Sequence, residues 1–343
     1  MKDLSIITIN LRNWENLSRF LRSVASITEA YFTYEVIVVD NSCDPEKINQ
    51  YRLLYPDFKI ILNTENIGVA FSKNLGASNA NGKYLLFLDV ENLITQRSAL
   101  AMLDQAKVSR ANSVVSCRQL SVNGAEINSY GYFPSLITLT GWLEKMARFL
   151  RIIDKPSENK RLIFPDWISG SVMMMSKTSF NRIGKWNERF WIYFEDVDFC
   201  SRATQMGGAV LMLKNVSVQR DQIISTRAEI EYMATLKTEQ KISNHEYISL
   251  HEDGVTEVLM HLFLVLSNLI TGLVGAIVGL VFYSRRSLQL LSRGYLKLLN
   301  YYLKALLLDT WISPRAIKHP ESILFINPLD ENVTVMQNKN LEI

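Results

Sequence analysis

Short apolar runs alternate with amphipathic stretches over the N-terminal part of the chain. The apolar runs predict buried strands at residues 4–9, 34–40, 58–63 and 83–89. Between them, apolar side chains recur at helical spacing and predict helices over residues 13–24, 46–54 and 70–80. The first of these helices shows the pattern with Trp14, Leu17, Phe20, Leu21 and Val24 on one side. The predicted order is strand, helix, strand, helix, strand, helix, strand.

This order predicts an α/β fold with a mostly parallel, Rossmann-like central sheet flanked by helices. Strands without polar positions are buried on both faces, and the crossovers between them are right-handed. Ligands of such sheets lie at the carboxyl ends of the strands. The predicted strands carry polar residues at those ends, namely Thr8, Asn10, Asp40, Asn63, Asp89 and Glu91. We therefore expect a binding site along this edge of the sheet.

The pattern changes beyond Asn112, where the apolar runs become shorter. "SVVSC" and "GSVMMMS" predict two further core strands, with an apolar helix between them over residues 139–152. After Ile223 the chain becomes helical and increasingly apolar. We therefore expect one unit over residues 1–222, with halves of about 1–110 and 111–222, and a helical C-terminal region over residues 223–343.

Composition narrows the class of protein. With 48% hydrophobic and 21% charged residues among 343, the chain has the make-up of a protein with a large buried core. A net charge of +3 is too small to indicate nucleic-acid binding. Cys43, Cys117 and Cys200 lie far apart, which fits a reducing compartment and neither a disulfide framework nor a zinc site. The N-terminus lacks the pattern of a secretory signal, so the cytoplasm is the expected compartment.

Two groups of acidic residues are candidates for chemistry. Asp89 and Glu91 end a buried strand with one residue between them, so both could face one hard cation such as Mg²⁺ or Mn²⁺. The alternative is that one of them caps the following helix.

The second group lies in "FWIYFEDVDFCSRA", which has the features of a helix start. Asp198 stands four residues before Arg202, so a pair between them within the helix gives Asp198 a structural role. Asp196, behind the aromatic Trp191 and Tyr193 that could stack on a sugar, could accept a proton from a hydroxyl nucleophile.

Six stretches of the chain carry a resemblance to a known family. They are "SIITIN", "VIVVDNS", "NIGVAFSKNLGA", "YLLFLDVEN", "ISGSVMMMSKTSFNRIGKWNERFWIYFEDVDFCSRATQMG" and "NVSV", in the family's order across roughly residues 4–218. In these stretches the chain resembles a family 2 glycosyltransferase of the GT-A fold, near the rhamnosyltransferase-like group that builds bacterial surface polysaccharides. The resemblance implies a nucleoside-diphosphate sugar donor and inversion at the anomeric carbon. It makes residues 1–110 the nucleotide-sugar half and residues 111–222 the acceptor half.

The resemblance also implies a role for each matching residue. Asp196 holds the place of the catalytic base, with Glu195 beside it to orient the acceptor or the base. Asp89 and Glu91 hold the place of the acidic motif that binds Mg²⁺ or Mn²⁺. The implied nucleotide-sugar-binding residues are Thr8, Asn10, Asp40, Asn66, Gly68, Asn74 and Asp89, and the implied acceptor-binding residues are Trp167, Gly170, Trp191 and Tyr193.

The chain departs from the family's pattern at three positions. Glu91 stands where an aspartate is usual, and Asn187 replaces an expected aspartate. Gln219 stands where related enzymes often carry a histidine, so Gln219 or Arg220 would have to substitute. These changes leave open an alternative, a catalytically silent homologue that acts as a membrane-anchored scaffold. A nucleotidyltransferase is disfavoured because "INLRNWENL" lacks a glycine-rich, basic loop after the first strand.

The apolar C-terminal region predicts attachment to a membrane. Residues 262–283 contain no charge and are long enough to cross a bilayer, which takes about 20 residues. The charges that flank them would place the N-terminal unit outside, away from cytoplasmic nucleotide sugars. On the next helix, Arg286, Arg293, Lys297 and Lys304 form a basic stripe, and Leu288, Leu291, Leu298, Leu299 and Tyr302 fill the other sectors.

This stripe favours a peripheral or monotopic helix at the cytoplasmic face of the inner membrane. The acceptor expected there is a polyprenyl-diphosphate-linked glycan of O-antigen, capsule or similar polysaccharide synthesis. Packing of the two helices on each other, or on a second subunit in a homo-oligomer, is the alternative that the sequence leaves open.

Overall fold

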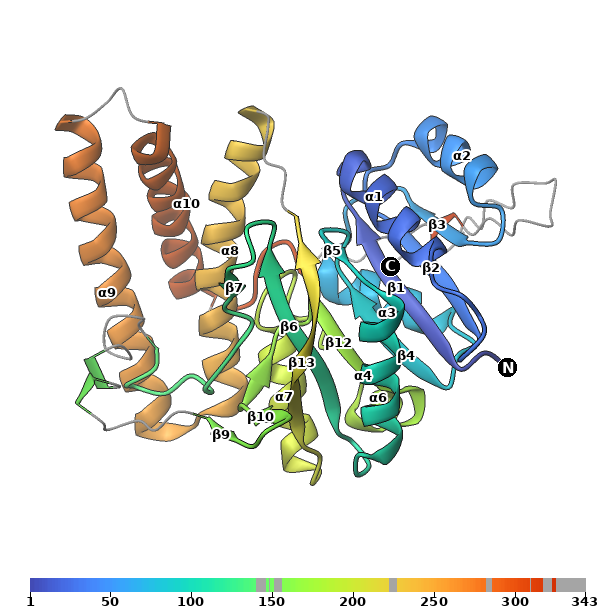
Figure 1. Ribbon diagram of the computed structural model, residues 1–343. Helices are drawn as coiled ribbons and strands as arrows, with labels where there is room; N and C mark the ends of the chain where they lie inside the picture. The colour runs from blue at the N-terminus through green and yellow to red at the C-terminus, as the bar shows by residue number, and fades with distance from the viewer. Residues whose placement is uncertain are drawn as a thin grey trace, which may run out of the picture.

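A twisted sheet with helices on both faces forms the larger part of the molecule (Figure 1). The structure, a computed structural model, describes residues 1–139, 146–147, 149–150, 156–221, 227–281, 286–308, 310–316 and 323–324. The four predicted N-terminal strands are confirmed as β1 (Leu4–Asn10), β2 (Tyr34–Asp40), β3 (Lys59–Asn63) and β4 (Tyr84–Leu88). All pair in parallel, in the order β3-β2-β1-β4.

The sheet continues past β4 with strands of mixed direction. β12 (Val172–Ser176) is antiparallel to both β4 and β6 (Val114–Ser121), and β13 (Val210–Arg220) is parallel to β6. Shorter strands extend the edges or pair separately: β5 (Asn92–Leu93), β7 (Glu126–Ile127), β9 (Ser157–Glu158), β10 (Leu162–Phe164), β14 (Ile323–Leu324), and β8 (Tyr130–Gly131) with β11 (Trp167–Ile168). The central sheet is therefore mostly parallel, as predicted.

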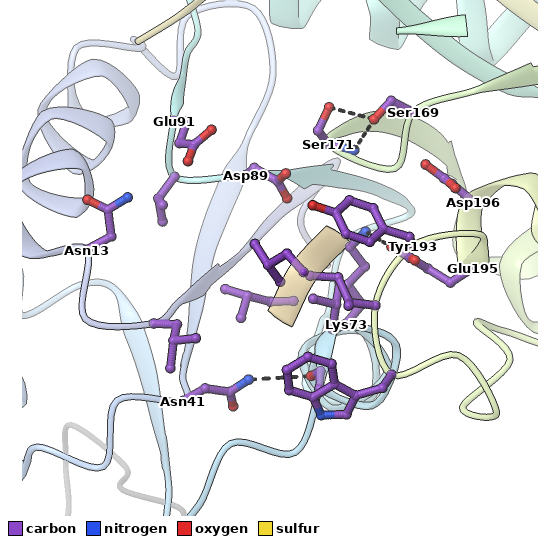
Figure 2. Close-up of a pocket in the computed structure, with 18 of the residues that line it drawn as sticks. Asn13, Asn41, Lys73, Asp89, Glu91, Ser169, Ser171, Tyr193, Glu195 and Asp196 are labelled. Carbon is purple, nitrogen blue, oxygen red and sulfur yellow. Dashed lines mark hydrogen bonds and ion pairs between the residues drawn. The ribbon is translucent and has the colours of Figure 1, made fainter. Parts of the chain in front are cut away.

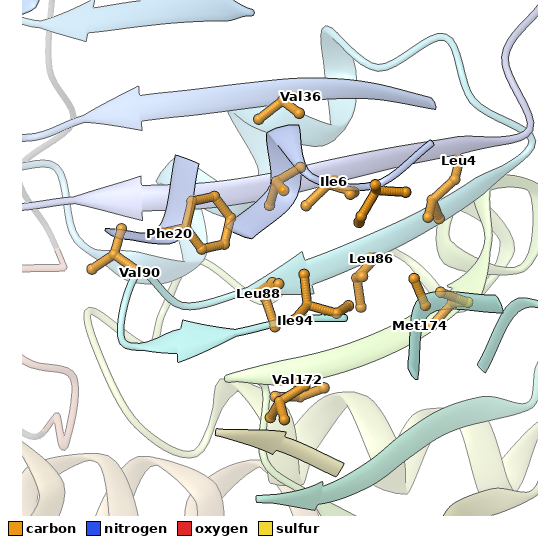
Figure 3. Close-up of a cluster of buried hydrophobic side chains, with 14 of the residues drawn as sticks. Leu4, Ile6, Phe20, Val36, Leu86, Leu88, Val90, Ile94, Val172 and Met174 are labelled. Atoms are coloured by element: carbon orange, nitrogen blue, oxygen red, sulfur yellow. The ribbon is translucent and has the colours of Figure 1, made fainter. Parts of the chain in front are cut away.

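Alternate strand residues build two cores, one on each face of the sheet. Ile6 faces a core formed with α1 (Trp14–Ala25), α2 (Pro45–Leu54) and α4 (Gln96–Val108), which Figure 3 shows around Phe20. Ile7, the next residue, faces α3 (Val69–Ser78), α6 (Lys177–Ile183) and α7 (Glu195–Gln205). The period-two alternation of a strand explains this division.

Two predictions about element boundaries fall wholly or partly on residues outside those described. Of the helix predicted over residues 139–152, the structure describes residues 139, 146–147 and 149–150. The predicted boundary between residues 222 and 223 also lies outside the described part of the chain.

Three long helices follow the sheet and stand side by side at one end of the molecule (Figure 1). They are α8 (Arg227–His251), α9 (Gly254–Val281) and α10 (Arg286–Leu308). Helix α8 joins them to the rest: Ser243 Oγ donates to the Ile192 carbonyl at 2.8 Å, and His251 Nε2 lies 2.9 Å from Asp198 Oδ1. Asp198 also accepts from Arg202 at 2.6 Å, which confirms the predicted pair.

The prediction that the apolar side of α10 enters lipid is wrong for two of its residues. Leu298 and Tyr302 are buried, because that side packs on α8 and α9. The tightest approach is at Gly272 on α9, which lies against the ring of Tyr295 on α10. The side chains of Arg286, Leu288, Leu291 and Arg293 lie outside the described residues. The alternative in which these helices pack on each other therefore applies to this side of α10.

One described helix is long and apolar enough to cross a membrane, judged by length and composition only. Its span is Gly254–Gly275, with a mean hydropathy of 2.0 over the most apolar window, of which 22% is buried.

Candidate active site

A cavity of about 310 Å³ lies between the carboxyl edge of the sheet and the loop that precedes α7. Asp89 and Glu91 line it from the end of β4, and Glu195 and Asp196 line it from the start of α7 (Figure 2). The two groups of acidic residues, distant in the chain, thus meet in a single cavity. This first cavity lies at the carboxyl ends of the strands, where proteins with parallel sheets bind their ligands.

Asp89 is held at the edge of the cavity by its backbone. Its N–H donates to the Ser171 carbonyl at 2.9 Å, which ties the end of β4 to the segment before β12. Burial raises the pKa of the Asp89 carboxyl, although the nearby cations Lys73 and Arg220 oppose the rise. The two cations therefore offset only part of the cost of burying the Asp89 carboxylate.

Glu91 is paired with a cation from β13. Its Oε2 accepts from Nε and Nη2 of Arg220 at 3.1 and 3.0 Å. The helix that follows, α4, has Thr95 as its N-cap, with Oγ1 accepting from the Ser98 N–H at 3.3 Å. The helix-capping reading of Asp89 and Glu91 is therefore wrong, since another residue supplies the cap.

Asp196 has both carboxylate oxygens fixed by backbone donors. Oδ1 accepts from the Val197 N–H and Oδ2 from the Gly170 N–H, each at 2.9 Å. Burial, together with the neighbouring carboxylate of Glu195, raises the pKa of Asp196 to about 6. At neutral pH this carboxylate is ionised, yet basic enough to accept a proton from a hydroxyl in a reaction.

The backbone just before these acids is strained. Tyr193 and Phe194 both have a φ of 65°, the left-handed region that non-glycine residues adopt at a cost of about 1–3 kcal/mol each. Helix α8 supports this turn, because Ser243 bonds to the Ile192 carbonyl and Tyr247 packs against the ring of Phe194. The turn aims the start of α7 into the cavity.

Lys73 on α3 forms a buried ion pair with Glu195. Its Nζ lies 3.0 Å from Glu195 Oε1, with side chains 5% and 6% exposed (Figure 2). Nζ also lies 4.6 Å from the centre of the Trp186 ring. Burial lowers the pKa of Lys73, but the carboxylates of Glu195, Asp89 and Asp196 raise it above its ordinary value. Lys73 therefore stays charged and allows three acids to lie close together.

A second cavity of about 270 Å³ adjoins the first. Ser169, Tyr193 and Asp196 line both cavities, so the Asp196 carboxylate stands where they meet. The second cavity is lined mainly by aromatic and amide side chains: Asn128, Tyr130, Tyr132, Trp167, Gln240 and Asn244. The buried Oδ1 of Asn244 has no hydrogen-bond partner. Aromatic faces and amides are the groups that bind uncharged sugars.

Of the predicted nucleotide-binding residues, Asn66, Gly68 and Asp89 line the first cavity. Thr8, Asn10, Asp40 and Asn74 do not line it. Asn10 Nδ2 instead donates to Asp40 Oδ1 at 2.7 Å, and Ser42 Oγ donates to the same oxygen at 2.7 Å. Burial raises the pKa of Asp40, partly offset by these bonds. Their contact with a base and ribose stays a prediction.

Asn74 serves a different purpose from the predicted one. Its Nδ2 donates to the Trp186 carbonyl and to Glu188, both at 2.8 Å, and its Oδ1 accepts from the Trp186 N–H. The side chain therefore ties α3 to the loop after α6 and does not line the first cavity. The preceding residue, Lys73, is the one that faces the cavity.

The predicted acceptor residues divide between the two cavities. Trp167 lines the second cavity and Tyr193 lines both, whereas Trp191 lines only the first. Trp191 thus lies in the same cavity as Asn66, Gly68 and Asp89, and its contact with an acceptor stays a prediction. Gly170 lines neither, but a Cβ there would lie 2.7 Å from Lys73 Nζ and 3.2 Å from Asp196 Cβ. Gly170 is needed because a side chain would separate Lys73 from the acids.

The sequence reading missed Lys73 as a site residue. A signal existed, because helical spacing places Lys73 on the side of Ala70 and Ala77, both buried. A lysine on a buried face needs an acidic partner. Its partner, Glu195, is too distant in the chain for that signal to identify it.

The charge of the first cavity fits a divalent cation. Four carboxylates line it against two basic groups, Lys73 and Arg220, so an anionic diphosphate needs further positive charge to enter. Asp89 and Glu91 offer the oxygen ligands that Mg²⁺ and Mn²⁺ take. Within the described residues, no cluster of three or more His, Cys, Asp and Glu side chains suits a metal. The other ligands would come from the diphosphate and water.

Comparisons with known proteins show similarity to glycosyltransferases. Residues 5–167 match the model of glycosyl transferase family 2. The low-salt glycan biosynthesis hexosyltransferase Agl10 of Haloferax volcanii is 26% identical over 241 residues, which cover 69% of this chain and 73% of that protein. Human polypeptide N-acetylgalactosaminyltransferase 14 is 26% identical over 213 residues, which cover 60% of this chain and only 38% of that protein.

A solved structure shows the same fold. GalNAc-T7, crystallised with UDP, GalNAc and Mn²⁺, superposes with a TM-score of 0.51 at 15% identity, over 69% of this chain and 48% of that one. The family match and the glycosyltransferase relatives show that the protein is a glycosyltransferase, and the solved structure shows that its fold is GT-A. Its residues 5–167 belong to glycosyl transferase family 2.

The pH dependence of transfer will report on Asp196. Because its pKa is about 6 and only the ionised form can take a proton, kcat/KM should rise with pH up to about 6 and then level off. Asp196→Asn should lower kcat by about a hundredfold or more without changing the thermal midpoint much. Initial rates from pH 5 to 8.5 test both. Full activity of the Asn variant would remove Asp196 from the mechanism.

Replacing Lys73 by Met should strongly destabilise the fold. The change leaves Glu195 as an unpaired buried charge, which costs about 3–5 kcal/mol of unfolding free energy. Adding Glu195→Gln to the same chain should recover much of the loss, since the unpaired charge at position 195 is then removed. Urea unfolding followed by circular dichroism measures both variants. Wild-type stability of Lys73→Met would show that the pair is not stabilising.

Proposed function

We propose that the protein transfers a sugar, with inversion, from a nucleoside-diphosphate sugar to a hydroxyl of a lipid-linked glycan. The observation that carries this proposal is the position of Asp196, whose carboxylate lines both cavities. The UDP and Mn²⁺ of the GalNAc-T7 structure support a nucleotide-sugar donor and a divalent metal. The donor occupies the first cavity and the acceptor the second.

The side chains divide the work of an inverting displacement. Asp196 accepts the proton of the acceptor hydroxyl while that oxygen attacks the anomeric carbon, and the two backbone N–H groups hold its carboxylate in place. Lys73 pairs with Glu195 and fixes it beside Asp196. Asp89 and Glu91 would hold the metal, which would supply positive charge for the departing diphosphate. Arg220, which lines the same cavity, adds a second positive charge.

The second cavity indicates an uncharged acceptor sugar. Among the described residues that line it, Asp196 is the one charged side chain, and none of them is a lysine or arginine that could bind a phosphate. Trp167 and Tyr130 offer ring faces, and Asn244 offers an unpaired carbonyl oxygen to a sugar hydroxyl. The reacting group is therefore a sugar hydroxyl, and the diphosphate of a lipid carrier lies outside this cavity.

The enzyme works at the cytoplasmic face of the inner membrane, attached without spanning it. Support comes from one side of α9, where apolar side chains at helical spacing are exposed: Val255, Val258, Leu259, Leu262, Leu266, Ile270, Leu273 and Val274. A second group of apolar side chains is exposed between residues 136 and 150: Leu136, Ile137, Met146, Phe149 and Leu150. Leu139 of the same part of the chain lines the second cavity. Such surfaces suit the lipid of the acceptor. The catalytic unit of residues 1–222 and the attachment region of residues 223–343 remain the proposed division.

The catalytically silent scaffold is not favoured. Its support was the altered acidic motif and Gln219. Against it, the four carboxylates and Lys73 line one cavity, and a second cavity adjoins it at Asp196, as a catalytic site would require.

Transfer should depend on a divalent metal. EDTA should abolish product formation, and Mg²⁺ or Mn²⁺ should restore it, because four carboxylates otherwise repel the diphosphate. A thermal-shift panel of UDP-, GDP- and dTDP-sugars with Mn²⁺ identifies the donor first, since a ligand of the native state raises the midpoint. Unchanged turnover in EDTA would show that Asp89 and Glu91 serve another purpose.

The acceptor cavity should prefer neutral glycosides. Octyl glycosides should give saturation-transfer NMR signals with the protein, and octyl phosphate should give none, because the described residues that line the cavity include no basic group. Asn244→Ala should raise the KM for the acceptor about three- to tenfold and leave the donor KM unchanged. Binding of octyl phosphate in preference to the glycosides would contradict the assignment.

A further inference from the structure

The C-terminal helical region forms part of the wall of both cavities. Met233 and Leu236 on α8 line the first cavity, and Gln240 and Asn244 on the same helix line the second. Their spacing places all four on one side of α8. The region that the sequence presents as a membrane attachment therefore also touches the donor and the acceptor sites.

A segment beyond α10, residues 310–316, returns to α8 and is anchored there. Trp311 stacks on His245 and His261, with ring centres 4.4 and 4.5 Å apart and planes within 12°. Tyr301 Oη donates to the Trp311 carbonyl at 2.6 Å. Ser313 Oγ donates to Glu239 Oε2 at 2.7 Å. These contacts fix the residues that follow.

Arg315 follows in this segment and connects α8 with the first cavity. It forms an ion pair with Glu239, whose side chain is fully buried, and its Cζ lies 5.4 Å from the centre of the Trp191 ring. The Arg315 side chain itself is 46% exposed. A guanidinium at this distance from an indole face is attracted to it.

Trp191, whose ring Arg315 contacts, lines the first cavity. Its carbonyl accepts from the Val69 N–H at 2.7 Å at the start of α3. Its ring lies so close to Gly68, which has a φ of 86°, that a Cβ there would be 2.6 Å from Trp191 Cδ1. Both residues line the first cavity. The Trp191 ring therefore lies against the backbone of Gly68 and is also in contact with the Arg315 guanidinium.

We propose that Arg315, held by Glu239, is a positioning residue that fixes Trp191 in the donor site, so that the C-terminal region contributes to binding of the nucleoside diphosphate. This inference rests on the proposed function, because it takes the first cavity as the donor site. This role would give a reason for the ion pair between the buried Glu239 and the half-exposed Arg315. Loss of Arg315 should free the ring without opening a cavity in the core.

The test compares three full-length variants with the unaltered chain by calorimetric titration with UDP, GDP and dTDP in the presence of Mn²⁺. Arg315→Ala should raise the Kd of the nucleotide that binds about five- to tenfold, and Arg315→Lys should recover most of the affinity, because an ammonium keeps both contacts. Arg189→Ala is the matched control. Arg189 is 48% exposed and pairs with Glu246 of α8, 1% exposed, and the structure gives it no contact with Trp191.

A double-mutant cycle separates positioning from general stability. In a Trp191→Leu chain, Arg315→Ala should cause no further loss of nucleotide affinity, whereas a purely structural role would add its effect in either background. Unchanged affinity of Arg315→Ala, equal loss in Arg189→Ala, or an additive cycle would overturn the inference alone. Failure of the unaltered chain to bind any of the three nucleotides would overturn the proposed function and this inference with it.

Discussion

The gathering of four carboxylates in one small cavity is the constraint on which the site depends. Like charges in a poorly hydrated space repel strongly, so the fold must supply cations at fixed points. Lys73 supplies one at Glu195, and Arg220 supplies another at Glu91. The remaining imbalance leaves the pKa values of Asp89 and Asp196 raised. The same imbalance suits a metal ion at one end of the cavity and a proton acceptor at the other.

The two raised pKa values have different chemical consequences. Asp89 lies at the sheet edge with Arg220 nearby, where a bound cation would favour its ionised form. Asp196 lies between the cavities, and backbone N–H groups hold it in a single orientation. A carboxylate that is fixed and moderately basic is suited to take a proton from a neutral hydroxyl. Burial is the first cause of both shifts, but neighbouring charges decide the role of each acid.

Much of the fold could be predicted because its signals are local. Continuous apolar runs predict β1 to β4, and the spacing of Leu17, Phe20 and Leu21 predicts α1. The acids at the end of β4 and the start of α7 could be singled out for the same reason. The bonds of Asn74 to Trp186 and the place of Trp191 in the first cavity could not be predicted, because the direction of a side chain depends on partners that adjacent residues do not reveal. Lys73 was missed because its partner lies in a distant element.

The sequence by itself determined the order of strands and helices, the strand end that carries Asp89 and the helix that begins with Glu195. Periodicity and capping act over a few residues, so they can be read from the chain. Only the tertiary structure decided that these acids share one cavity, that Arg220 pairs with Glu91, and that α8 lines both cavities. Those arrangements depend on how distant elements pack and how buried charges find partners, and neither is encoded in local spacing.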